Sequence, residues 1–142
     1  VDLTSNAWAY HGLACLYLKS DPEKAKQFIM EGMALQRERL SYQKEGFKIL
    51  EKCGAYKEID EEYKKQTAEN QKNGRIQYYY VAALAKLERN EEAYHLLNDG
   101  DGIDVSDIRE GDSDIQSIWE SLHEKVYGEK GHLPHYYNFK VN

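Results

Sequence analysis

Apolar residues recur along the first hundred residues in three similar blocks. The blocks read AWAYHGLACLYLKSDPEKAKQFI from Ala7, SYQKEGFKILEKCGAYKEIDEEY from Ser41 and RIQYYYVAALAKLERNEEAYHLL from Arg75, so each begins 34 residues after the one before. Within a block the apolar positions lie three or four residues apart, which is the period of an amphipathic helix, and a short polar stretch divides the block in two. Each block therefore predicts a helix, a tight turn and a second helix.

The same columns of the three blocks hold apolar residues, and these columns are expected to face the core. The columns are Leu13, Phe47 and Val81; Leu16, Leu50 and Leu84; Ala25, Ile59 and Ala93; and Ile29, Tyr63 and Leu97. The pattern predicts six helices, over residues 6–19, 22–38, 41–53, 56–72, 74–88 and 91–98.

The turns between these helices carry residues that are typical of helix ends. Asp21 followed by Pro22 supplies an N-cap and a proline in the first turn, and Gly54 can adopt the positive φ that often ends a helix. Asn90 is expected to cap the next helix, with two acidic residues after it that suit the positive end of the helix dipole.

The pattern changes after residue 98. Residues 99–112 form an acidic connector rich in glycine, and Ser113 begins a capping-box sequence, SDIQ, that predicts a helix over residues 113–127. The apolar stripe of that helix is Ile115, Ile118, Trp119, Leu122 and Val126. Because Trp119 is too large to remain in water, we expect this helix to cover the exposed face of the third repeat. In residues 128–142, apolar and polar residues alternate near the end, which favours an extended tail.

Composition narrows the class of protein. The chain has 142 residues, 41% hydrophobic content and a net charge of −6, which fit one soluble domain and argue against a nucleic-acid-binding or membrane-spanning protein. Both cysteines, Cys15 and Cys53, lie on apolar helical faces, so we expect a reduced, buried pair in a cytoplasmic protein. The chain begins at Val1 without a signal-peptide pattern, and we expect a fragment of something longer.

The 34-residue period and the small residues near the eighth column of the first helices, Gly12, Gly46 and Ala82, resemble tetratricopeptide repeats. This resemblance covers residues 6 to about 98. It implies an all-α fold, a superhelix of three helix-turn-helix units at about residues 7–40, 41–74 and 75–98, followed by the capping helix and the extended tail, as a single domain over residues 1–142.

A second, shorter resemblance lies in the C-terminal part. The segments VSDIREGD, which contains Asp107 to Gly111, SIWESLHEK, which contains Ile118 and Trp119, and YYNFK are similar to the end of bacterial tetratricopeptide proteins that carry an uncharacterised N-terminal domain. Some of those proteins are associated with carbohydrate enzymes. This resemblance implies that the chain is an accessory part of a larger protein.

The sequence contains no signature of catalysis or of a cofactor. There is no Ser-His-Asp or Cys-His arrangement, no phosphate-binding glycine loop and no histidine spacing that predicts a metal site. The acidic connector does not match a calcium loop, because a register that starts at Asp99 places Ile103 and Asp104 where an oxygen ligand and a glycine are required. We therefore expect a protein that is not an enzyme and binds no metal or cofactor.

The first helices of the three units are expected to line a concave groove, as they do in the resembling family. For a helical period, the residues away from the core columns form a basic, tyrosine-rich face on an acidic protein. These candidate groove residues are Tyr10, Tyr17, Lys44, Lys48, Lys52, Arg75, Tyr78, Tyr79 and Lys86. Such a face favours a peptide or partner domain, acidic in character, as ligand.

Two functions stay open from the sequence. The first is a protein-protein interaction scaffold that binds its partner in this groove. The second is an accessory structural or oligomerisation module of a larger enzyme, in which a homodimer or a contact with a missing domain of the same chain fills the groove. The acidic connector could also fold back against the basic groove.

Overall fold

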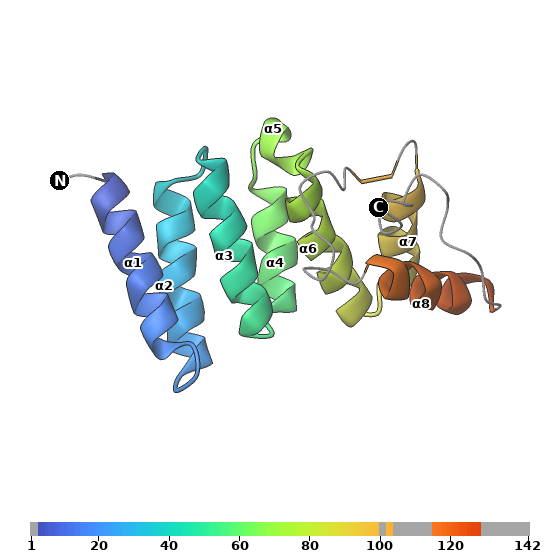
Figure 1. Ribbon diagram of the computed structural model, residues 1–142, viewed down its shortest axis with the longest axis horizontal. Coiled ribbons are helices and arrows are strands. Elements are labelled where there is room, and N and C mark those ends of the chain that lie inside the picture. Colours follow the sequence, from blue (N-terminus) through green and yellow to red (C-terminus); the bar gives the residue numbers. More distant parts are fainter. Residues whose placement is uncertain (1–2, 100–101, 104–114, 129–142) are drawn as a thin grey trace, which may run out of the picture. The chain divides into compact units, whose positions relative to one another are not determined.

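A computed structural model describes residues 3–99, 102–103 and 115–128 (Figure 1). Throughout these residues the secondary structure is helical and no strand occurs, so the expected all-α class is confirmed. The helices are α1 (Leu3–Tyr17), α2 (Pro22–Leu35), α3 (Leu40–Lys52), α4 (Tyr56–Lys64), α5 (Ala68–Gln71), α6 (Gly74–Lys86), α7 (Asn90–Asn98) and α8 (Ile115–Tyr127). The contacts divide the chain into two compact units, Val1–Gln71 and Lys72–Asn142.

A membrane-spanning segment would need a long, uninterrupted apolar helix, and none of the described helices meets that condition.

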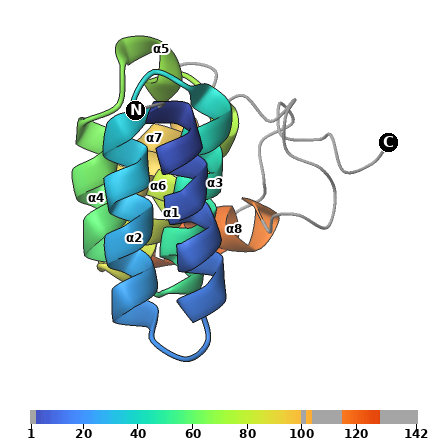
Figure 2. The ribbon, with the colours of Figure 1, turned by 90° about the vertical axis from the view of Figure 1, so that its left-hand side faces the viewer.

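The first unit begins with an antiparallel pair, α1 and α2, joined by a tight turn (Figure 2). The Asp21 carboxylate accepts a hydrogen bond from the backbone N–H of Lys24 at 3.2 Å, and Pro22 occupies the first turn of α2. Gly54, after α3, has a φ of +69°. These two predicted helix ends are confirmed.

Close packing between α2 and α3 forms the centre of the first unit. A Cβ atom built on Gly32 would lie 1.8 Å from the Tyr42 hydroxyl oxygen, and one built on Gly46 would lie 2.4 Å from the Met33 sulfur. The Tyr42 hydroxyl donates a 2.6 Å hydrogen bond to the carbonyl of Ala7 in α1. Tyr42 of α3 therefore fills the space above Gly32 of α2, and Met33 of α2 fills the space above Gly46 of α3.

The face of α1 that is buried differs from the expected one. Ala7 and Ala14 are fully buried, whereas Leu13 and Leu16 are 37% and 70% exposed. The equivalent residues of α3 and α6 are buried as predicted, so among the first helices of the three blocks the expectation is wrong for α1 alone. In the second helices, Tyr63 of α4 is only partly buried. Cys15 is exposed as well, which corrects the prediction of a buried cysteine pair, and both cysteines are free thiols.

The predicted helix over residues 56–72 is interrupted. α4 ends at Lys64, and the hydroxyl of Thr67 accepts the backbone N–H of Asn70 to start the short α5. Tyr63 and Gln71 bridge the break, because the Tyr63 hydroxyl donates to the Gln71 carbonyl and the Gln71 amide donates to the Tyr63 carbonyl. Side chains thus replace the backbone hydrogen bonds that the break removes.

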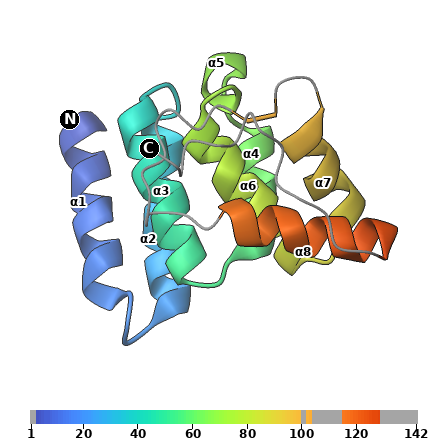
Figure 3. The same ribbon diagram turned by 45° about the vertical axis from the view of Figure 1, so that its right-hand side comes forward.

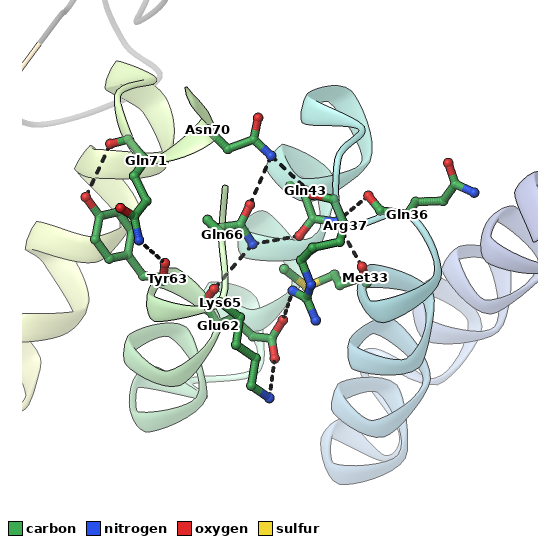
Figure 4. A network of polar contacts seen from close by, with 10 residues as sticks. All are labelled: Met33, Gln36, Arg37, Gln43, Glu62, Tyr63, Lys65, Gln66, Asn70 and Gln71. Carbon is green, nitrogen blue, oxygen red and sulfur yellow. Dashed lines mark hydrogen bonds and ion pairs between the residues drawn. The ribbon is translucent and has the colours of Figure 1, made fainter. Parts of the chain in front are cut away.

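The helix predicted over residues 22–38 also ends early, at Leu35. The Gln43 side-chain amide of α3 donates to the carbonyls of Met33 and Gln36, at 3.0 and 2.7 Å (Figure 4). These bonds satisfy carbonyls at the end of α2 and so stabilise its termination.

The second unit contains α6, α7 and α8. Asn73 caps α6, because its side-chain oxygen accepts the backbone N–H groups of Arg75 and Ile76. Glu88, with a φ of 63°, makes the turn that follows α6. Asn90 is not the cap that the sequence predicted, since it lies in the first turn of α7 and the preceding residue, Arg89, is at the N-cap position.

α8 crosses α6 and α7 and packs on both (Figure 3). Trp119 and Leu122 are buried in one core cluster with residues of α6 and α7, and Ile118 and Val126 pack against that cluster. Within the second unit, α8 therefore covers the helices of the third repeat as predicted.

Three sequence predictions lie outside the described residues: the capping box at Ser113, the course of the acidic connector over residues 104–112, and the extended tail over residues 129–142. The arrangement of the repeats as one superhelix stays a prediction from the resemblance.

Candidate interaction surface

The candidate groove residues of α3 form a partly exposed basic row. Lys48 and Lys52 are exposed and Lys44 is half-buried. Next to this row, the Glu45 carboxylate lies 3.4 Å from Nε2 of His11 in α1. α3 thus presents Lys48 and Lys52 to solvent, and their part in a groove stays a prediction.

Tyr10 and Tyr17 lie on a different side of their helix from the one that faces α3. Their rings contact Phe28 of α2, with ring centroids 6.2 and 5.9 Å apart, and Nζ of Lys24 lies 4.6 Å from the centre of the Tyr17 ring. A hydrogen bond with Glu31 is the main cause that raises the pKa of Tyr10. Both tyrosines therefore pack between α1 and α2.

The aromatic residues of α6 contribute more to the core than to an open surface. Tyr79 is only 6% exposed, and its ring meets that of Tyr78 edge to face at 6.0 Å. Tyr78 packs against the core cluster of the second unit, and Arg75 is half-buried. Lys86, at the end of α6, is exposed and is the candidate groove residue of this unit that is open to a ligand.

A hollow of about 250 Å³ lies between α6 and α8. Apolar side chains line it together with serines and lysines from the two helices. The lining residues are Ala82, Ala85, Lys86, Ser117, Ile118, Ser121, Leu122 and Lys125. Its size suits a single apolar side chain rather than a whole small-molecule substrate.

The charge of this hollow is positive. Lys86 and Lys125 are both exposed, and neither forms an ion pair with any residue that the structure describes. Lys125 also lines a neighbouring hollow with Glu88, Glu91 and Glu92. An acidic group that approaches the hollow between α6 and α8 would therefore meet two ammonium groups beside an apolar surface.

The sequence predicted one of these two lysines. Lys86 belongs to the candidate groove, whereas Lys125, Ser117 and Ser121 were not among the predicted site residues. Helical periodicity places these three on the polar side of the last helix, and only the packing of α8 on α6 brings them beside Lys86.

A polar cluster anchors α8 to α7 and so shapes this hollow. The indole N–H of Trp119 donates to the side-chain oxygen of Asn98 at 2.7 Å, and the Tyr94 hydroxyl lies 2.9 Å from Nδ1 of His123. The rings of Trp119 and His123 stack with centroids 4.9 Å apart. These bonds fix the rotation of α8 about its axis.

A second hollow of the same unit is acidic. It has a volume of about 680 Å³ and lies mainly over α6 and α7. Its lining residues are Gln77, Tyr80, Leu84, Glu91, Glu92, His95, Leu96, Asp99 and Gly102. No group of three or more histidine, cysteine or acidic side chains that could hold a metal ion occurs among the residues with a described placement.

The first unit holds a buried polar network that the sequence did not predict (Figure 4). Glu62, 1% exposed, pairs with Arg37 at 2.6 Å and with Lys65 at 3.4 Å. Gln66 donates to Gln43 and to the carbonyl of Glu62. Asn70 donates to the carbonyl of Arg37 and to Gln66, so the network joins the end of α2 to α3, α4 and α5. The network thus connects segments that lie up to 33 residues apart in the sequence.

Comparison of the chain with protein-family models, with curated proteins and with solved structures gives no match.

Proposed function

We propose that this protein is a non-catalytic interaction scaffold that binds an acidic segment of a partner protein. The observation that carries the proposal is the hollow between α6 and α8, in which an apolar floor lies between Lys86 and Lys125. The apolar floor accepts one aliphatic or aromatic side chain of the partner. The two lysines bind carboxylates that flank that side chain.

The chemistry of the surface supports binding rather than turnover. Lys48 and Lys52 of α3 are exposed as well, so the first unit also presents cations to solvent. A partner that presents an apolar residue between acidic residues fits the exposed groups best.

The test is a binding measurement with an immobilised peptide library in which every member carries one leucine or phenylalanine between glutamates. The variant is Lys86→Glu combined with Lys125→Glu. Both side chains are exposed, so the fold is expected to persist, and circular dichroism checks this. We expect the charge reversal to weaken binding of the selected peptides by about tenfold or more, which corresponds to about 1.4 kcal/mol.

The matched control is Lys48→Glu combined with Lys52→Glu, which makes the same change of net charge on exposed residues of α3. Binding should then fall by less than about threefold, because Lys48 and Lys52 do not line the hollow and exposed charges outside a contact are screened by salt. Equal loss in both double variants would assign the effect to net charge or to α3. Unchanged binding in the Lys86/Lys125 variant would refute the proposed site.

A further inference from the structure

One face of α1 is open to solvent and carries no charged side chain, although the Trp8 ring at its edge also meets Tyr42 of α3. The exposed residues on it include Trp8 at 39%, Leu13 at 37% and Leu16 at 70%. Gly12 and Cys15 lie between them and are exposed too. The whole of α1, LTSNAWAYHGLACLY, contains no Asp, Glu, Lys or Arg, although such residues make up 31% of the chain. A solvent-facing helix surface normally carries charges.

The 34-residue period of the sequence shows which residues of α3 are equivalent to this face of α1. The residues of α3 at the equivalent positions are Tyr42, Gly46, Phe47, Ile49 and Leu50. All five are buried, with exposures between 0% and 3% where a side chain is present. The face that is open on α1 is therefore the face that is covered on α3.

A single helix, α2, provides much of that cover. Gly32 of α2 lies under the Tyr42 ring, and Met33 of α2 enters the space above Gly46. Gln43 ties the two helices together through the carbonyl of Met33. The interface thus pairs a small residue on each helix with a large residue on the other.

Among the residues that the structure describes, nothing fills the equivalent space on α1. A Cβ atom built on Gly12 has no neighbour within 4 Å, whereas the same construction on Gly46 meets Met33 at 2.4 Å. Trp8 stands where α3 has Tyr42, and Leu13 and Leu16 stand where it has Phe47 and Leu50. α1 therefore retains the small residue and the large apolar residues of this interface, and no helix of the described part of the chain lies opposite them.

We infer that the open face of α1 is the seat of one further helix of the α2 kind, the second helix of another helix-turn-helix unit of the same array. Its apolar stripe places a flexible side chain such as methionine over Gly12 and a small residue under Trp8. The absence of charge on α1 matches that occupant, because a buried lysine or glutamate would need a partner.

The experiment supplies that helix to the full chain. A copy of residues 20–36 is placed directly before Leu3, which keeps the 34-residue register because residue 36 is equivalent to residue 2. We expect the melting temperature to rise by about 5 °C. We also expect alkylation of Cys15, which lies on the covered face, to slow by about tenfold.

Two variants of the extended chain distinguish docking on this face from a general effect of the added segment. Leu16→Glu should abolish both the rise in melting temperature and the protection of Cys15. Leu87→Glu, at a leucine of the second unit that is 36% exposed, should leave both in place. The inference is overturned if the extension changes neither quantity, or if Leu16→Glu leaves both changes intact.

The chain without the extension tests the competing occupant, a second copy. Sedimentation velocity over a range of protein concentrations should show that the chain does not dimerise through the open face of α1. A dimer that Leu16→Glu dissociates would overturn the inference, because the face would then belong to a homodimer interface.

Discussion

At the scale of single residues, Tyr42 is the point at which α1, α2 and α3 meet. Its ring is fully buried above Gly32, and its hydroxyl donates to the carbonyl of Ala7. Trp8 meets the ring edge to face at 4.9 Å. Burial, with a smaller contribution from the Cys15 thiol, raises the pKa of Tyr42 to about 12. The ionisation of Tyr42 is therefore expected to make the free energy of unfolding depend on pH.

The Tyr42→Phe variant tests this link. A tyrosine in the unfolded chain has a pKa of about 10, so the stabilisation that comes from keeping Tyr42 neutral is complete below pH 10 and is lost as pH rises toward 12. In the wild type, the free energy of unfolding should fall over this range by up to about 1.4 kcal/mol per pH unit more than in Tyr42→Phe. At pH 7, the variant should be less stable by about 1 kcal/mol, because the hydrogen bond from the Tyr42 hydroxyl to the Ala7 carbonyl is lost.

Urea denaturation at several pH values measures both effects. An equally steep alkaline loss of stability in Tyr42→Phe would show that other groups cause it.

Substitution by alanine is expected to have opposite effects on stability at two glycines of the first unit, Gly32 and Gly12. Gly32→Ala places a methyl group against the Tyr42 hydroxyl, so we expect a loss of about 1–3 kcal/mol from overpacking. Gly12→Ala enters open space on α1 and should gain up to about 1 kcal/mol from the higher helix propensity of alanine. Thermal denaturation of the two variants provides the comparison, and a stabilising Gly32→Ala would contradict the described packing.

At the scale of elements, the break between α4 and α5 lies beside a buried carboxylate. Glu62 is 1% exposed and binds Arg37, which follows α2, and Lys65, which follows α4. Gln66 and Asn70 continue the network to α3 and α5. The ends of four helices are thus held by polar groups whose partners come from other helices.

A double-mutant cycle on Arg37 and Glu62 measures this connection. Arg37→Met leaves the buried Glu62 carboxylate with Lys65 as its remaining cation, and we expect a loss of about 3 kcal/mol. Adding Glu62→Met removes the buried carboxylate that has lost its Arg37 partner, so the double variant should recover to within about 1 kcal/mol of the wild type. Additive losses in chemical denaturation would exclude a direct coupling between the two residues.

At the scale of the whole molecule, the surroundings of a residue decide how much it contributes to stability, even where the 34-residue pattern makes residues equivalent. Leu16, Leu50 and Leu84 occupy one column of the 34-residue pattern, but their exposures are 70%, 0% and 1%. Sequence makes these leucines equivalent, and the presence or absence of a neighbouring helix makes them different.

Substitution of each leucine by alanine tests this difference. Leu50→Ala and Leu84→Ala should each cost about 2–5 kcal/mol, because a cavity forms in a packed core. Leu16→Ala should change the free energy of unfolding by less than about 0.5 kcal/mol. Similar losses at all three positions would mean that Leu16 is covered in solution, which equilibrium unfolding at different protein concentrations would trace to self-association.

The sequence by itself determined the helical class, the approximate course of the helices and the core columns of α3 and α6, since these depend on periodicity within one segment. It also predicted the cap at Asp21 and the burial of Trp119, because a local hydrogen bond and a large apolar ring carry their own signal.

Only the tertiary structure decided which helices and which polar groups lie next to a given side chain. Periodicity defines an apolar face but not whether a helix covers it, so Leu16 and Leu50 could not be told apart. A polar residue such as Gln43 or Glu62 is tolerated in the core only when donors and acceptors from other helices reach it. The hollow that is lined by Lys86 and Lys125 likewise could not be predicted from the sequence, because it exists only where α8 packs on α6.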